Sequence, residues 1–208
     1  FTQGTLESSD KTLDLAIAGE GFFVVRGAAP RQEVTYTRNG AFSVNANREV
    51  VDTIGSKLQL LPVDADGNAT STALADATDL VLPLNSPADP SATLANVSIG
   101  IDGLVTATYS DGTSEKLGKV AMASFTAVEG LRPVGDAHWQ STGDSGMPLI
   151  NTANNGPLGT IRSGALERAN VDVTEELVAL ISAQRNFQAN AKAIETAKSM
   201  TQSIININ

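Results

Sequence analysis

The chain has 208 residues, of which 41% are hydrophobic, enough to form the core of one large or two small domains. A formal net charge of −9 with scattered Lys and Arg argues against a nucleic-acid-binding protein, which needs a basic surface to neutralise phosphates. The absence of cysteine excludes disulfides and Cys-based catalytic or zinc sites, and no apolar run reaches the length of about 18 residues that spans a membrane.

A mainly β region is predicted from Leu13 to about Gly159. Its short apolar runs are separated by Gly, Asp, Asn and Pro, which is typical of strands joined by turns. The runs "LDLAIAG" and "GFFVVRG" predict two strands hinged on Gly19 and Gly21. We therefore expect the first part of the chain to build a β domain.

The next segments predict hairpins. "VTYTRNGAFSV" (34–44) indicates a β-hairpin whose tight turn is Asn39-Gly40, because these residue types tolerate positive φ. The turn signal recurs at Asp66-Gly67, Asp102-Gly103 and Asp111-Gly112. In "VSIGIDGLVTATYSDG" the alternation of apolar residues predicts strands with one buried face, carrying Val97, Ile99, Ile101 and Val105.

Two stretches are predicted to be irregular. "PLNSPADPSATLAN" (83–96) is rich in Pro, Ala and Ser, and it is the best candidate for a boundary inside the β region. "MPLINTANNGPLG" (147–159) is the second.

A long helix is predicted over 172–206, where more than thirty residues contain neither Gly nor Pro. Asp172 and Glu175 have the spacing of a helix N-cap and its capping-box partner. About 35 residues at ~1.5 Å each give a rod of roughly 50 Å. Steps of four and three residues define a coiled-coil-like seam that polar residues interrupt, which we call the helix seam: Leu177, Leu180, Ile181, Gln184, Phe187, Ala191 and Ile194. Such a seam needs a partner helix, and no upstream segment is long enough to provide one.

Three segments contain residues typical of catalytic or ligand-binding sites. "TGDSGMP" (142–148) has the Gly-Asp-Ser-Gly sequence that surrounds a serine-protease nucleophile, but the only histidine, His138, is seven residues before Ser145. A Gly-Ser turn is therefore the prediction. His138 and Trp139 are predicted to be packing anchors rather than a stacking platform. "DADGNAT" (64–70) has calcium-loop spacing, yet Ala75 stands where the last carboxylate belongs, so a hairpin turn is predicted. We expect no catalytic residue, cofactor, metal or small-molecule substrate.

Four segments resemble the bacterial flagellar hook and rod (axial) proteins. They are "TLDLAIAGEGFFVV" (12–25), "YTRNGAFSVNANREVVD" (36–52), "LGKVAMASFTAVEGLRPVGDAHWQST" (117–142) and "GALERANVDVTEELVALISAQRNFQANAKAIETA" (164–197). "FTQG" at the start, "VSIGIDGLVTATYSDG" and "KVAMASFTAVEGL" look most like the hook protein, and the distal rod protein is the near neighbour.

The resemblance implies a mainly β fold with a long C-terminal helix. We expect a β-rich core domain over 1–168 and a helical assembly domain over 169–208, which pairs in a coiled coil with an N-terminal helix that should precede Phe1 and is absent from this chain. The outer β domain of hook proteins is expected near Asn96-Val97 and is also absent, which keeps the rod interpretation open.

The resemblance also implies a function. The chain is expected to be a structural subunit, not an enzyme, that polymerises in many copies into a hollow helical tube joining rod to filament and transmitting torque for motility. Its expected partners are other axial and junction proteins, the type III export apparatus and the hook cap, with no nucleic acid. The expected place is the extracellular hook, or the periplasm-spanning basal body for a rod protein, without a cleaved signal peptide. The alternative from another class is a secreted β-rich hydrolase using Ser145 and His138.

Overall fold

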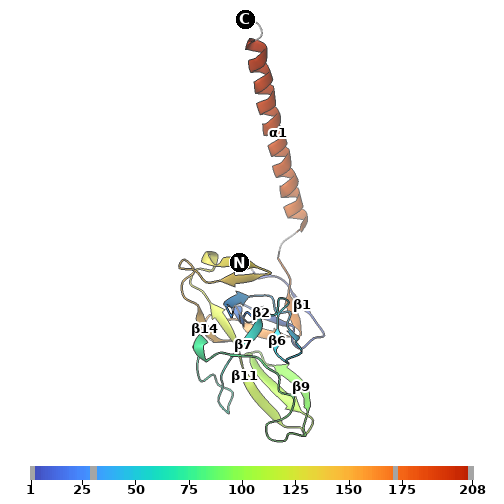
Figure 1. Ribbon diagram of the computed structural model, residues 1–208, viewed down its shortest axis with the longest axis vertical. Coiled ribbons are helices and arrows are strands. Elements are labelled where there is room, and N and C mark those ends of the chain that lie inside the picture. The colour runs from blue at the N-terminus through green and yellow to red at the C-terminus, as the bar shows by residue number, and fades with distance from the viewer. Residues whose placement is uncertain (1–2, 29–31, 171–172, 206–208) are drawn as a thin grey trace. The chain divides into compact units, whose positions relative to one another are not determined.

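The structure is a computed structural model that describes residues 3–28, 32–170 and 173–205, with side chains of the helix described from 177 to 198 (Figure 1). The chain divides into two compact units, Phe1–Arg168 and Ala169–Asn208. The first is built of strands and we call it the β unit; the second contains the helix and we call it the helical unit. The predicted N-cap, Asp172 with Glu175, lies outside the residues whose side chains are described.

The β unit consists of short strands. They are β1 (Leu6–Ser8), β2 (Leu15–Ala18), β3 (Phe22–Arg26), β4 (Val34–Thr37), β5 (Ser43–Val44), β6 (Val50–Val51), β7 (Lys57–Leu61), β8 (Thr78–Asp79), β9 (Leu94–Ile99), β10 (Leu104–Tyr109), β11 (Ser114–Ser124), β12 (Arg132–Gly135), β13 (His138–Gln140), β14 (Leu149–Thr152), β15 (Thr160–Ser163) and β16 (Ala165–Glu167). Two 3-10 turns, η1 (Leu74–Asp76) and η2 (Val128–Gly130), interrupt the loops.

Twelve of these strands form one sheet around β11, the longest strand. The strand order is β12-β13-β4-β3-β11-β7-β6-β5, while β10, β14 and β8 attach beside this path and β9 pairs with β10. All the pairings between named strands are antiparallel, and two further pairs, β1-β16 and β2-β15, complete the unit (Figure 1). Strand β11 can bind four neighbours because it pairs on both edges along its length: its first part pairs with β10 and β7, and its last part pairs with β14 and β3.

The core is centred on β2 and β3, which are buried on both faces. Every residue of Leu15–Ile17 and of Phe22–Val25 is buried, so the predicted pair of strands is confirmed. The bend between them occurs at Gly19 and Gly21, each with a φ of 122° that side-chain-bearing residues rarely adopt. The largest cluster contains Phe23, which meets Phe42 edge to face at a centroid distance of 5.6 Å.

The hairpin predicted over 34–44 is wrong. Strand β4 pairs with β3 on one edge and β13 on the other, and β5 pairs with β6 instead. Neither Asn39 nor Gly40 has a positive φ. The Gly40 carbonyl instead accepts a hydrogen bond from the Leu15 amide at 2.9 Å. Gly40 is therefore needed because β2 passes against it, and not for a tight turn.

Gly40→Ala is expected to destabilise the β unit by about 1–3 kcal/mol through overpacking. A Cβ at this position would lie 1.7 Å from the Leu15 carbonyl oxygen, which belongs to a buried backbone and cannot rotate away. Thermal unfolding followed by circular dichroism would measure it, with a fall of roughly 2–4 °C in Tm for each kcal/mol. Gly143→Ala is the matched control, because a Cβ there meets nothing within 4 Å. Equal Tm values for the two variants would contradict the close approach.

The other turns and strands mostly follow the sequence. Gly67, Gly103 and Gly112 have φ values of 90°, 81° and 84°, which confirms the three Asp-Gly turns. The prediction for Ile101 is wrong, since it lies in the β9-β10 turn and is 67% exposed. The stretch 147–159 is not wholly irregular, because Leu149–Thr152 forms β14 against β11.

Asn96-Val97, the expected place of an outer domain, lies within a strand. Asn96 and Val97 both belong to β9, where they lie opposite Thr108 and Ala107 of β10. The irregular part of the 83–96 stretch therefore ends before Leu94, where β9 begins.

The helical unit contains the predicted long helix, α1 (Val173–Ile205), which has 33 residues. The fold is thus mainly β with one long C-terminal helix in the part of the chain that the structure describes. No helix among the described residues is both long and apolar enough to cross a membrane.

Candidate functional site

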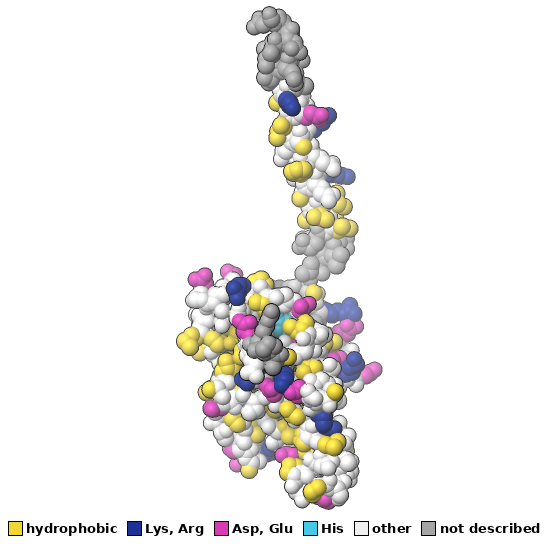
Figure 2. Space-filling model, in the orientation of Figure 1, with side chains coloured by type: hydrophobic (Ala, Val, Ile, Leu, Met, Phe, Trp, Pro, Cys, Tyr) yellow, Lys and Arg dark blue, Asp and Glu magenta, His cyan; other side chains and the backbone are white. Residues whose placement is uncertain are grey.

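The helix seam lies on one continuous helix, because Leu177 to Ile194 all belong to α1. In the helical unit its large apolar side chains are exposed, with Phe187 at 76% and Ile194 at 71%. Figure 2 shows hydrophobic side chains following one another along the described part of this helix. Leu177, Leu180 and Ile181 are exposed as well. The helix therefore presents an apolar stripe without an apolar partner among the described residues of its own unit.

Polar residues accompany this stripe. Gln184 lies within the seam, and it is exposed like every described side chain of the helix. Lys192 and Glu195 form an ion pair at 2.8 Å, but both are largely exposed, so the pair adds little stability. The helix consequently owes little to its own side-chain contacts, and a packing partner would supply most of its stability.

A second feature lies where the two ends of the β unit meet. Strands β1 and β16 pair with Leu6 opposite Glu167, and the Arg168 amide donates to the Thr5 carbonyl at 2.9 Å. Arg168 also forms an ion pair with Glu7. The beginning and end of this unit are therefore held side by side. We call the β1-β16 pair, together with Arg38, the terminal joint.

Within the terminal joint, Arg38 links the β1-β16 pair to the core. Its Nε donates to Glu167 Oε2 at 2.9 Å, and its two terminal nitrogens donate to the Gly21 and Gly19 carbonyls, each at 3.1 Å. The other oxygen of Glu167 accepts the Gly4 amide at 2.9 Å. The side chains of Arg38 and Glu167 are only 18% and 10% exposed, so this ion pair is far better shielded than a surface pair.

The sequence does not signal the terminal joint. Arg38 and Glu167 are 129 residues apart, and neither stands in a motif that identifies a partner. The carbonyls of Gly19 and Gly21 accept hydrogen bonds from the guanidinium, a function that the predicted hinge did not include. Only the packed β unit brings these groups together.

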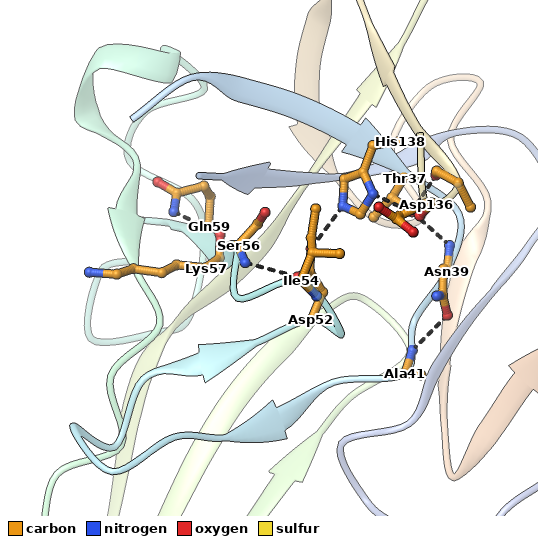
Figure 3. A network of polar contacts seen from close by, with 11 residues as sticks. Thr37, Asn39, Ala41, Asp52, Ile54, Ser56, Lys57, Gln59, Asp136 and His138 are labelled. Carbon is orange, nitrogen blue, oxygen red and sulfur yellow. Dashed lines mark hydrogen bonds and ion pairs between the residues drawn. The ribbon is translucent and has the colours of Figure 1, made fainter. Parts of the chain in front are cut away.

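His138 lies in a buried polar network with Asp52 (Figure 3). Its Nε2 is 2.8 Å from Asp52 Oδ2, and its Nδ1 is 2.9 Å from the Asp136 carbonyl oxygen. Asp52 also accepts the Ile54 and Ser56 amides at 3.0 and 2.8 Å. His138 is buried and Trp139 packs against Phe22 at 5.8 Å, which confirms the packing interpretation; the carboxylate partner was not predicted.

Opposing effects act on this pair. Burial by itself lowers the pKa of His138, but the hydrogen bonds to Asp52 and to the Asp136 carbonyl outweigh it, and the pKa lies above its ordinary value. Burial raises the pKa of Asp52, while the hydrogen bonds from His138, Ser56 and Ile54 hold that pKa below its ordinary value. Both shifts favour the charged ion pair.

Ser145 does not meet His138 in a catalytic arrangement. Its hydroxyl donates to the Thr142 and Gly146 carbonyls at 3.0 and 3.1 Å, and it accepts the Thr142 amide at 2.9 Å. The side chain is fully buried, so it holds the 142–146 turn together, as the turn interpretation predicts. Both ring nitrogens of His138 are engaged by other groups.

The calcium-like segment is also a turn. Asp64 Oδ1 accepts the Asn68 amide at 2.8 Å, and Val63 and Ala69 form an antiparallel bridge. Among the described residues, no three His, Asp or Glu side chains gather where they would hold a metal ion.

Two family models match the chain. The "Flagellar hook protein FlgE/F/G D1 domain" matches residues 16–107, and the "Flagellar basal body rod FlgEFG protein C-terminal" matches residues 162–207. The first covers the core strands, and the second covers β16, the end of the β unit and helix α1.

Individual relatives come from both branches. The chain is 41% identical over 114 residues to the flagellar hook protein FlgE of Escherichia coli K12, which is 55% of this chain and 28% of that protein. It is 32% identical over 204 residues to the flagellar basal-body rod protein FlgG of Buchnera aphidicola subsp. Baizongia pistaciae, 98% of this chain and 68% of that protein.

The Helicobacter pylori flagellar hook protein FlgE2 is similar in structure with a TM-score of 0.33 and 14% identity, over 74% of this chain and 43% of that one. That likeness is too distant to carry an argument. The rod-protein match, by contrast, spans nearly the whole chain, and both family models agree with it. The chain belongs to the bacterial flagellar hook and rod family, whose members are structural proteins of the flagellum.

Proposed function

We propose that this chain is a structural subunit of the flagellar hook, which polymerises into a hollow helical tube and transmits torque from rod to filament. The observation that carries the proposal is the exposed helix seam. Phe187 and Ile194 are more than two-thirds exposed in the helical unit, and soluble monomers rarely expose a large apolar surface. In a polymer, neighbouring subunits would cover such a stripe.

The spacing of the seam indicates a helix as the partner. Leu177, Leu180 and Phe187 follow steps of three and seven residues, the repeat with which two helices interlock. Gln184 within the seam would weaken the pairing, but a single polar residue at such a position also defines its register. The proposed interface residues are Leu177, Leu180, Ile181, Gln184, Phe187, Ala191 and Ile194.

The terminal joint supports a partner from the N-terminal side of the same protein. Thr5 and Arg168 are hydrogen-bonded, and α1 begins five residues after Arg168. A helix preceding residue 1, as the family resemblance implies, would therefore attach to the β unit beside the segment that leads into α1. Neighbouring subunits would then cover the remaining surface of the helix pair.

The hook is proposed over the rod because the highest identity among the relatives given above, 41%, is with a hook protein. The distal rod protein is the second candidate, and it is favoured by the match to a rod protein over 98% of this chain. In either case we propose that the partners are other axial and junction proteins, and the export apparatus and hook cap during assembly. The absence of cysteine suits a chain that is exported unfolded.

The full-length gene is expected to restore hooks in cells of its source bacterium that lack their hook gene, and not in cells that lack the distal rod gene. Electron microscopy of isolated basal bodies would score the structures, and swimming would score torque transmission. Restoration of the distal rod alone would favour the second candidate. Hydrolysis of an ester or peptide that disappears in Ser145→Ala, without any assembly, would favour the hydrolase alternative.

A further inference from the structure

We propose that His138 is a proton-dependent latch that holds the β12-β13 hairpin on the edge of the large sheet and releases it when the ring becomes neutral. The proposal concerns the β unit alone and does not depend on the assignment to hook or rod. It starts from the two hydrogen bonds of the ring. Nε2 faces a carboxylate oxygen of Asp52 at 2.8 Å, and Nδ1 faces the Asp136 carbonyl oxygen at 2.9 Å.

The two partners of the ring are both acceptors. A carbonyl oxygen cannot donate a hydrogen bond, and an ionised carboxylate cannot donate either. Both contacts are therefore satisfied only by an imidazolium, which has an N–H on each nitrogen. The bonds to Asp52 from the Ile54 and Ser56 amides keep that carboxylate ionised. The geometry consequently requires the positive ring.

The charged groups that face His138 are consistent with a positively charged ring. Asp52 comes from the turn between β6 and β7, and Asp136 comes from the hairpin turn itself. Glu33 lines the same cavity of about 190 Å³ from the segment before β4. All three groups are acids, and Asp52 and Asp136 both favour a protonated ring. Ile54 and Val134 also line the cavity.

The turn that the latch holds is strained. Gly135, Asp136 and Ala137 have consecutive φ values of 102°, 49° and 60°, a left-handed conformation that Ala in particular disfavours. Such a backbone persists only where its surroundings hold it. Two groups do so: the His138 ring binds the Asp136 carbonyl, and the Thr37 hydroxyl donates to the Ala137 carbonyl at 2.8 Å (Figure 3).

Loss of one proton acts directly on this turn. The remaining N–H would stay on Nε2, where the Asp52 carboxylate is the stronger acceptor. The lone pair of Nδ1 would then face the lone pairs of the Asp136 carbonyl, so this partly buried contact would lose its hydrogen bond. Because β12 is the outermost strand and β13 covers β4, loosening the hairpin would uncover the edge of β4 (Val34–Thr37). An uncovered strand edge is a site for pairing with another chain.

The first test is a titration of the ring by nitrogen-15 NMR on the whole chain. His138 is the only histidine, so its signals need no assignment by mutagenesis. The ring is expected to titrate with a midpoint above the ordinary value of about 6.5, with protons on both nitrogens below that midpoint. A midpoint at or below the ordinary value would overturn the proposal.

The second test is amide hydrogen exchange across the same midpoint. Protection factors of the β12-β13 hairpin are expected to fall roughly tenfold for each pH unit by which the midpoint exceeds about 6.5, while those of the β9-β10 hairpin stay level. In His138→Gln the two hairpins should respond alike to pH. A ring that titrates while both wild-type hairpins keep equal protection would refute the latch, and if His138→Gln does not fold, this wild-type comparison still decides.

Discussion

Phe187→Asp is expected to abolish tube formation by the full-length protein while leaving its β unit folded. Phe187 is 76% exposed in the helical unit, so the substitution removes no packing there, but in the proposed seam it would bury an unpaired carboxylate. A loss of about 3 kcal/mol per subunit, at the low end for such a charge, raises the concentration needed for polymerisation roughly a hundredfold. Sedimentation and electron microscopy of the purified protein would measure this.

The matched control is Gln188→Asp, which places the same charge one position further along α1 and outside the seam. It should polymerise nearly as well as the unaltered protein. Thermal unfolding of the β unit should be unchanged in both variants, since surface substitutions usually alter stability by less than about 0.5 kcal/mol. The proposed interface would be contradicted if cells that produce the Phe187→Asp protein were motile and had normal hooks. Equal polymerisation defects in Phe187→Asp and Gln188→Asp would contradict it as well.

Arg38→Ala is expected to destabilise the β unit by about 3 kcal/mol and to release its first strand. The change leaves the poorly exposed Glu167 carboxylate without its ion pair, and it removes the donors of the Gly19 and Gly21 carbonyls. Urea unfolding would measure the loss of stability. Limited proteolysis should also cut within the first strand, because Glu167 is the shared anchor of Arg38 and the Gly4 amide.

Two controls separate the geometry of the terminal joint from its charge. Arg38→Lys keeps the charge but has no planar fork with which to reach the carboxylate and both carbonyls, so most of the loss should remain. Arg168→Ala removes the ion pair between Arg168 and Glu7. Their side chains are 67% and 56% exposed, so the loss of stability should be less than about 1 kcal/mol. If Arg38→Ala were as mild as Arg168→Ala, the terminal joint would not depend on Arg38.

The elements predicted correctly from the sequence are those that depend on local interactions. Helix α1 was predicted over 172–206 and is found at Val173–Ile205, because helical hydrogen bonds join residues four apart and the segment has no Gly or Pro to break them. The turns at Gly67, Gly103 and Gly112 were predicted for the same reason, since a turn is decided within four residues. The seam of α1 could be read from its spacing, although its partner remains a proposal.

Which strands pair and which polar groups meet depends on contacts between distant parts of the chain. The segment 34–44 has residues typical of a hairpin. Strand β4 nevertheless pairs with β3 on one edge and with β13 on the other, so both of its edges are hydrogen-bonded within the sheet. His138 and Asp52 are 86 residues apart, and Arg38 and Glu167 are 129 apart. Residues so far apart in the sequence are brought together by the packing of the whole β unit. The residues next to each of them in the sequence do not indicate which partner it contacts.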